Sequence, residues 1–115
     1  MTESIAAVAT VQVDNELTQV TEWRFAPGAT TGYHTHEHDY VIVPLYTGKL
    51  ELTGPDGVTI GDLTAGTSYY REAGIEHDVK NINDHEFAFV EVEFKSTSIV
   101  SDADLTQAQG GQRSG

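Results

Sequence analysis

The chain is built of short runs in which apolar and polar residues alternate, with turn-forming residues between them. Alternation with a period of two places successive side chains on opposite faces, which is typical of a β-strand with one buried face. Pro27-Gly28 and the Gly- and Pro-containing run 54–57 mark turns between such runs. We predict strands over residues 8–13, 18–25, 40–46, 49–53, 58–60, 67–71, 77–82 and 87–94.

Two of these strands have irregular or ambiguous patterns. In the first, Val20 is out of phase with Trp23 and Phe25, which predicts a kink or bulge within 18–25. In 87–94, Phe and Glu occupy one face while Ala, Val and Phe occupy the other. Either face of that strand could therefore line the interior of a barrel.

The number and spacing of the strands indicate the fold class. Many short strands at close spacing predict an all-β protein, an antiparallel sandwich or barrel of jelly-roll type. A chain of 115 residues suits one domain. We expect that domain to span 1–95 and to be followed by a polar C-terminal tail over 96–115, which is rich in Ser, Asp and Gly.

Charge and composition exclude several classes of function. Lys and Arg number 6 against 18 Asp and Glu, so the formal net charge is −12. A polyanion of this kind disfavours nucleic acid and anionic membranes as partners. The absence of cysteine excludes disulfides, thiolate metal sites and thiol nucleophiles. No signal-peptide pattern or apolar run of about 20 residues is present, so we expect a cytoplasmic protein.

Histidine is the most informative residue type. His34 and His36 are two residues apart, and in a strand such residues face the same side, so both imidazoles can bind one metal ion. His77, which follows the turn at 73–74, is the natural third ligand. His38 continues the same spacing and remains an alternative ligand. These side chains fit a divalent transition metal, and iron, manganese, nickel, zinc and copper are all compatible with them.

Two spaced motifs contain these histidines. Gly28 is followed after five residues by His34-x-His36, and later by Gly48. In the second motif, Gly66 is followed after five residues by Glu72-x-Gly74-x-x-His77-x-x-x-Asn81. Together the motifs resemble those of the cupin superfamily, with Glu72 in place of the family's Pro. The runs 38–45 and 71–79 resemble more narrowly a group of small single-domain cupins, some of them associated with β-alanine degradation.

The resemblance implies a double-stranded β-helix, a divalent metal inside the barrel, a small-molecule ligand and a homodimer. The usual ligands of the family correspond here to His34, His36 and His77, while the first motif's Glu is missing. Counting back from Gly48 places that Glu position at Val41. Counting forward from His36 and strand phase favour Tyr40, which requires a one-residue bulge before Pro44.

The lost carboxylate suggests a type of chemistry. Three neutral imidazoles leave the full charge of the metal ion in place, which favours an anionic or oxygen-rich ligand. Three-His cupin sites occur in dioxygenases, so we expect a dioxygenase- or lyase-type enzyme. The alternative is a protein that binds a metal or small molecule without catalysis, such as a sensor or accessory protein.

Three further side chains are candidates for the site. Tyr40 could bind the metal, present its hydroxyl to a substrate or pack in the core. Arg71 could bind a substrate carboxylate, unless it pairs with Glu72 on the outer face. Glu76 could orient a histidine or act as a general base, unless it simply lies at the surface.

Overall fold

Every regular element of the computed structural model, which describes residues 5–95, is a β-strand. The predicted C-terminal tail over 96–115 lies outside the described residues. No helix in the described part of the chain is long and apolar enough to cross a membrane. The strands are β1 (Ile5–Ala6), β2 (Val8–Asp14), β3 (Thr18–Phe25), β4 (Ala29–Thr30), β5 (His34–Thr35), β6 (Asp39–Pro44), β7 (Gly48–Gly54), β8 (Gly57–Leu63), β9 (Tyr69–Arg71), β10 (Glu76–Asn81) and β11 (Phe87–Phe94).

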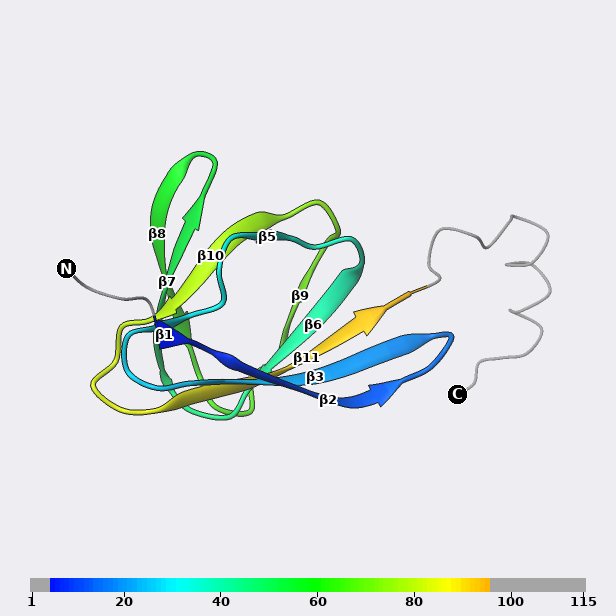
Figure 1. Cartoon of the computed structure of the whole chain (residues 1–115), viewed down its shortest axis with the longest axis horizontal. Helices are drawn as coiled ribbons and strands as arrows, with labels where there is room; N and C mark the ends of the chain where they lie inside the picture. The colour runs from blue at the N-terminus through cyan, green and yellow to red at the C-terminus, as the bar shows by residue number, and fades with distance from the viewer. Residues whose placement is uncertain (1–4, 96–115) are drawn as a thin grey trace.

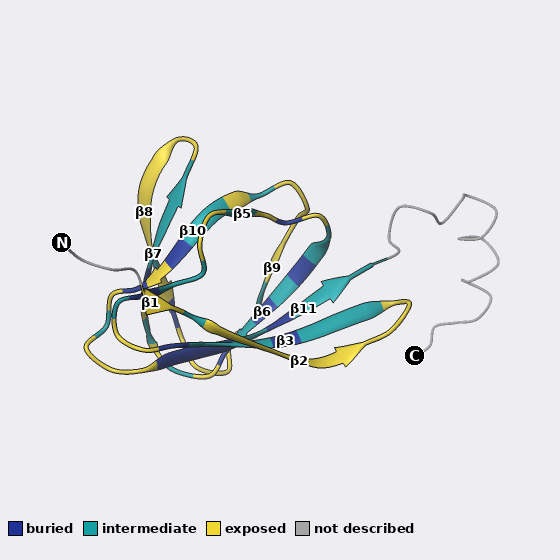
Figure 2. Cartoon of the chain, viewed as in Figure 1, coloured by how far each residue is buried: buried dark blue, intermediate teal, exposed yellow. Residues whose placement is uncertain are grey.

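The strands form two sheets. One has the order β1-β4-β10-β7-β8, with β5 also paired to β10, and the other has the order β2-β3-β11-β6-β9. Figure 1 shows β2, β3, β11 and β6 side by side in one layer, while β10, β7 and β8 belong to the other. The long strands β2 and β8 are exposed edge strands, as Figure 2 shows. This arrangement confirms the predicted all-β jelly-roll class.

The core lies between the sheets and consists of the inward residues of the alternating strands. Phe25 and Phe87 have no exposed surface, and the ring of Phe25 packs on that of Phe89 at 5.5 Å between centroids. Burial of each Phe side chain stabilises the fold by roughly 1.5–3 kcal/mol. The inward face of β11 is therefore the face that carries Phe87, Phe89 and Glu91.

Three local predictions differ from the structure. β3 pairs with β11 without a shift, and the bulge lies instead in its other neighbour β2, between Val11 and Val13. The predicted bulge before Pro44 is wrong, because β6 pairs continuously with β11 from Asp39 to Pro44. The two-residue strands β1, β4 and β5 were not predicted, because so short a run cannot show alternation.

Candidate metal centre

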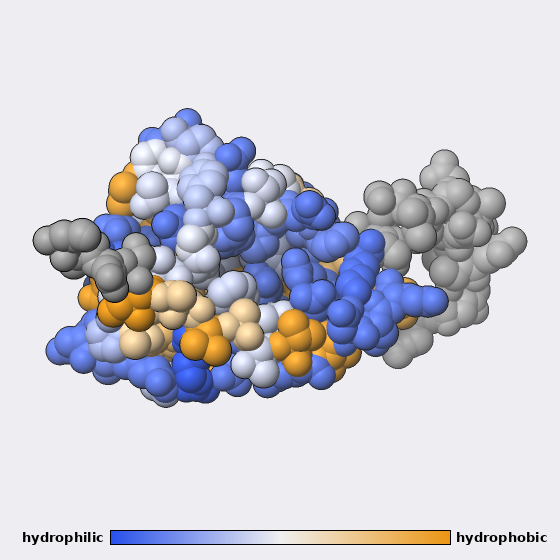
Figure 3. Space-filling model, viewed as in Figure 1, coloured by the Kyte–Doolittle hydropathy of each residue, from blue (hydrophilic) through white to orange (hydrophobic). Residues whose placement is uncertain are grey.

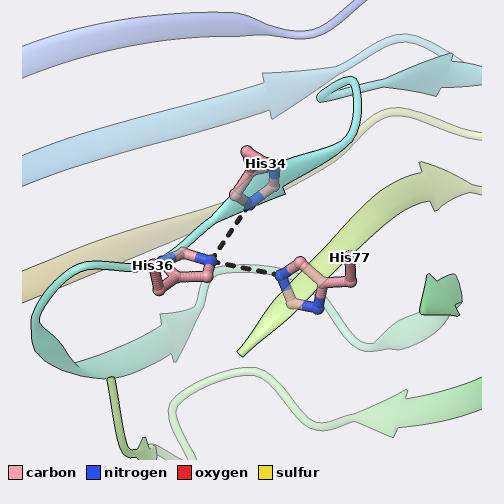
Figure 4. A group of neighbouring side chains, drawn as sticks. All are labelled: His34, His36 and His77. Atoms are coloured by element: carbon pink, nitrogen blue, oxygen red, sulfur yellow. Dashed lines mark hydrogen bonds between the residues drawn. The ribbon is translucent and has the colours of Figure 1, made fainter. Parts of the chain in front are cut away.

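Three imidazole rings meet inside the fold. Nε2 of His36 lies 3.0 Å from Nε2 of His34 and 3.2 Å from Nε2 of His77. The ligand atoms of the three residues lie within 4.8 Å of one another. Figure 4 shows the rings pointing toward one another from β5, from the segment after β5 and from β10. Among the described residues His38 is not part of this group.

Pairing between two strands brings His34 and His77 together. β5 and β10 are antiparallel, and His34 and His77 are directly opposite each other in their register. Opposite residues of a β-pair project from the same face, so both rings enter the interior. The neighbouring pair, Glu76 and Thr35, projects from the other face.

His36 lies beyond the end of β5 and is held by a turn. Its backbone N–H donates to the carbonyl of Ile75 at 2.8 Å, and its carbonyl accepts from the N–H of Gly74 at 2.8 Å. Gly74 has a φ of +101°, a conformation that side-chain-bearing residues rarely adopt. Strand alternation was the expected reason for the two first-motif histidines to share a side, but β5 ends at Thr35 and the Gly74 turn holds His36.

The protonation of these rings suits a metal ion. Nδ1 of His34 lies 2.8 Å from the carbonyl of Gly32, which can only accept, so Nδ1 carries a proton and Nε2 is the atom that bears the lone pair when the ring is neutral. Burial, with the nearby His34, lowers the pKa of His36 and of His77 to about 4. At neutral pH both rings are therefore neutral.

The separations of the nitrogens also fit a metal. Lone pairs that face one another at 3.0 Å repel unless a proton or a cation lies between them. A divalent transition metal binds imidazole at about 2.0–2.1 Å, which places two ligand nitrogens at right angles roughly 3 Å apart. The three histidines could therefore hold a metal ion.

Tyr40 lies against this cluster. Its side chain is 2% exposed, and its ring stacks on that of His36 with 4.0 Å between centroids and 20° between planes. Burial raises the pKa of the phenol, so the group is neutral at physiological pH. The position agrees with the strand phase that favoured Tyr40 over Val41 for the missing Glu.

Arg71 lies next to Tyr40 and is itself exposed. It is directly opposite Tyr40 in the pairing of β9 with β6, and its guanidinium lies 4.4 Å from the centre of the Tyr69 ring. Its one side-chain hydrogen bond within residues 5–95 goes to the carbonyl of Tyr70, and no ion pair of the described residues includes it. By contrast, Arg24 pairs with Glu22 and Glu86.

The carboxylate of Glu76 points away from the histidines. Glu76 precedes His77 in β10, so their side chains alternate, and its Oε1 accepts a hydrogen bond from the Tyr33 hydroxyl at 2.8 Å. Glu76 nonetheless contributes to the lining of the cavity.

A cavity of about 300 Å³ opens beside the histidines. All three histidines line it, together with the aromatic residues Trp23, Tyr40 and Tyr69, apolar residues of the core and Arg71. Largely apolar pockets of this size with a few polar groups are typical of small-molecule sites.

Sequence reasoning missed Glu91, a buried carboxylate in this wall. It is 7% exposed, and its Oε1 accepts a hydrogen bond from Nε1 of Trp23 at 3.3 Å. Its Oε2 lies 3.6 Å from Nδ1 of His36, and burial raises its pKa to about 7. The signal was present in 87–94, where Glu shares a face with Phe, but either face of that strand could have been the inner one.

The comparison with protein families agrees with this geometry. The model of the Cupin domain matches residues 21–93. The chain belongs to the cupin family. This cupin is 58% identical over 89 residues to the beta-alanine degradation protein BauB of Pseudomonas aeruginosa, covering 77% of this chain and 94% of the relative.

Solved structures show the same fold. A cupin domain from Bordetella pertussis is 51% identical to this cupin, with a TM-score of 0.82 over 84% of this chain and 100% of that one. A Klebsiella pneumoniae protein with a double-stranded β-helix domain has 21% identity and a TM-score of 0.67, covering 85% of this chain and 84% of that one. The fold of this cupin is therefore a double-stranded β-helix.

Proposed function

We propose that this cupin binds a divalent transition metal through His34, His36 and His77, and that a small anionic or oxygen-rich molecule binds beside it. The observation that carries the proposal is the convergence of three Nε2 atoms, with separations of 3.0 and 3.2 Å. Three protein ligands leave positions on the metal for water or substrate.

Arg71 supports an anionic ligand. Arg71 lines the same cavity as the histidines, and its guanidinium has no carboxylate partner among the described residues. Arg binds carboxylates with two parallel hydrogen bonds, which fixes the orientation of the bound group. The chain as a whole has a net charge of −12, so attraction of an anion depends on this local pair of charges, the metal and Arg71.

We further propose that the site is catalytic, with dioxygenase- or lyase-type chemistry. The metal supplies Lewis acidity or a site for dioxygen. Arg71 holds the anionic end of the substrate, the Tyr40 phenol is neutral and can donate a proton in a hydrogen bond, and the aromatic walls exclude water. The name of the Pseudomonas relative links that protein to β-alanine degradation, so small acids related to β-alanine are the first compounds to test.

Metal analysis of the protein and of the His34→Ala variant tests the ligand assignment. We expect about one equivalent of metal in the parent protein and a marked loss in the variant, whereas His38→Ala retains the metal. Equal metal content in the parent and in His34→Ala would disprove the site.

Turnover is tested separately with the iron-loaded protein. We expect dioxygen uptake or product formation with at least one member of a panel of small acids, β-dicarbonyls and thiols. Metal binding without turnover of any compound would favour a non-catalytic binding protein.

We also propose that this cupin forms a homodimer through β2. All residues of this edge strand are exposed, including Val8 at 62% and Val11 at 53%. Apolar side chains gather over β1 and β2 on the face that Figure 3 shows. An unpaired edge with apolar side chains can pair with the same strand of a second copy.

A further inference from the structure

Glu91 is a buried carboxylate in the wall of the candidate metal centre, and the ligand set does not account for it. Burial of an unpaired carboxylate is costly, so such a group normally has a charged partner or several donors. Glu91 accepts one side-chain hydrogen bond, from Trp23, and none of the Lys and Arg ion pairs within residues 5–95 includes it. What lies next to its second oxygen is the ring of His36.

His36 lies between Glu91 and the centre of the histidine cluster. Its Nε2 faces the other two histidines at 3.0 and 3.2 Å, while its Nδ1 is 3.6 Å from Oε2 of Glu91. His34 has the same arrangement, with Nδ1 on the carbonyl of Gly32 and Nε2 toward the cluster. Both first-motif rings therefore have an acceptor beside Nδ1, hydrogen-bonded in His34 and 3.6 Å away in His36. An acceptor at this position favours the Nδ1–H tautomer and leaves Nε2 free for a metal.

The position of Glu91 is fixed by its neighbours. Trp23 and Glu91 lie on adjacent strands, β3 and β11, and the indole N–H holds one carboxylate oxygen at 3.3 Å. Tyr40 stacks on the His36 ring, which limits the rotation of that ring. The carboxylate thus has one oxygen on Trp23 and the other directed at the ring edge of His36.

We propose that Glu91 is a positioning residue for the metal centre: it orients His36 through Nδ1 and makes its Nε2 a stronger ligand. This inference rests on the proposed metal binding. A carboxylate behind a metal-bound histidine fixes the tautomer and increases ligand basicity. It also places a negative charge near an ion that three neutral imidazoles leave uncompensated. β11 thereby supplies a carboxylate in place of the one that the first motif lacks. This carboxylate lies beside the ligand His36 and does not itself bind the metal.

The affinity for Zn²⁺, measured by competition with a chromophoric chelator, tests the inference. The variants are Glu91→Gln, which removes the charge but keeps the shape, and Glu91→Asp, which keeps the charge. Glu93→Gln is the matched control, because Glu93 lies on the same face of β11 and, within residues 5–95, no hydrogen bond or ion pair joins its carboxylate to His36. We expect about ten- to a hundredfold weaker binding in Glu91→Gln, partial recovery in Glu91→Asp, and a change of less than about twofold in Glu93→Gln.

The possible results are distinguishable. Zn²⁺ affinity of Glu91→Gln equal to that of the parent protein, with the parent binding Zn²⁺ normally, overturns the role of Glu91 and leaves the metal site standing. A parent protein that binds no Zn²⁺ overturns the proposed function. Thermal unfolding of the metal-free proteins checks folding, and we expect Glu91→Gln to be at least as stable as the parent because a buried charge is removed.

A measurement on the parent protein alone keeps the inference testable if Glu91→Gln does not fold. Histidine-ring ¹H–¹⁵N spectra of the Zn²⁺-loaded protein report which nitrogen of each ring carries the proton. We expect Nδ1–H for His36. A His36 ring protonated at Nε2 and bound through Nδ1 would contradict the proposal.

Discussion

His36 is the most tightly fixed of the three histidines. Its backbone N–H and carbonyl bond to the turn at Gly74 and Ile75, and its ring stacks on Tyr40. A metal ligand held on several sides loses little conformational entropy when it binds, which favours a preorganised centre.

Arg71 has no carboxylate partner within the described residues, so its charge is available to a bound anion.

Replacement of Arg71 by Gln should weaken anion binding and leave metal binding intact. A hydrogen bond to a charged group contributes about 1.5–3 kcal/mol, so we expect an affinity loss of roughly ten- to a hundredfold for small carboxylates. Isothermal titration calorimetry, with mono- and dicarboxylates added to the metal-loaded protein, measures this loss.

Arg24→Gln is the matched control for that experiment, since Arg24 is already paired with Glu22 and Glu86. It should leave carboxylate affinity unchanged. An Arg71→Gln variant that binds carboxylates like the parent protein would remove Arg71 from the ligand site.

The metal-free protein should lose stability as the pH falls from about 7 to 5. Burial, with the nearby His34, lowers the pKa of His36 and His77 to about 4, below the ordinary value of 6.5. In this range the unfolded state takes up protons on both histidines that the folded state does not, so acidification favours unfolding.

Glu91 acts in the opposite direction. Burial raises its pKa from 4.5 to about 7, so the folded state takes up one proton in the same range. Two histidines outweigh one carboxylate, and the net effect remains a loss of stability. Urea unfolding at several pH values, after treatment with a chelator, measures the slope. His77→Gln should have a shallower slope, and a parent protein that gains stability over this range would refute the expectation.

At the scale of the elements, the turn at Gly74 connects the two motifs. Gly74 is the second-motif glycine, its φ is +101°, and its N–H donates to the carbonyl of His36 in the first motif. A Cβ added at this position would meet no heavy atom within 4 Å. The requirement for glycine is therefore one of backbone conformation and not of space.

Gly74→Ala should destabilise the fold by about 1–2 kcal/mol, the cost of a left-handed conformation in a residue with a Cβ. It should also weaken metal binding. Relief of the backbone strain at residue 74 would move the N–H that holds the carbonyl of His36, and so displace this ligand. Urea unfolding and Zn²⁺ titration measure the two effects.

Gly61→Ala is the control. Gly61 has no positive φ, and its added Cβ would make ordinary contacts at 3.6 Å with Leu52 and Leu63. We expect little change in either measurement. Equal stabilities of the Gly61 and Gly74 variants would contradict the role of the turn.

The strands that are long enough to show alternation were predicted from the sequence, and the two-residue strands were not. The run 87–94 coincides with β11, and 18–25 with β3, because eight residues give several periods. Two-residue β5 gives none, although it positions His34. The face of β11 and hence Glu91 could not be predicted, because both faces carry apolar residues and only tertiary packing selects the inner one. The convergence of the histidines could be predicted, because the two motifs have the spacing of cupin motifs and each contributes histidines at the positions of the metal ligands.

At the scale of the whole molecule, two long edge strands have a neighbour on one side only within residues 5–95. β2 and β8 both carry exposed apolar residues: Val8 and Val11 on β2, and Val58 and Ile60 on β8. β2 is exposed along its whole length, whereas β8 becomes buried at Leu63. Ala9 and Val11 also line a second cavity of about 290 Å³ that reaches His34 and His36. In the proposed dimer, a second copy paired on β2 would lie next to the strand that lines this cavity.

Val8→Lys/Val11→Lys should convert the proposed dimer to a monomer. Lysine on an edge strand opposes edge-to-edge pairing, because two copies would bring like charges together. Light scattering after size-exclusion chromatography measures the mass, and Val58→Lys/Ile60→Lys, the same change on β8, should leave the dimer intact. A dimer abolished only by the β8 substitutions would transfer the interface to the other sheet, and a monomeric parent protein would refute the dimer altogether.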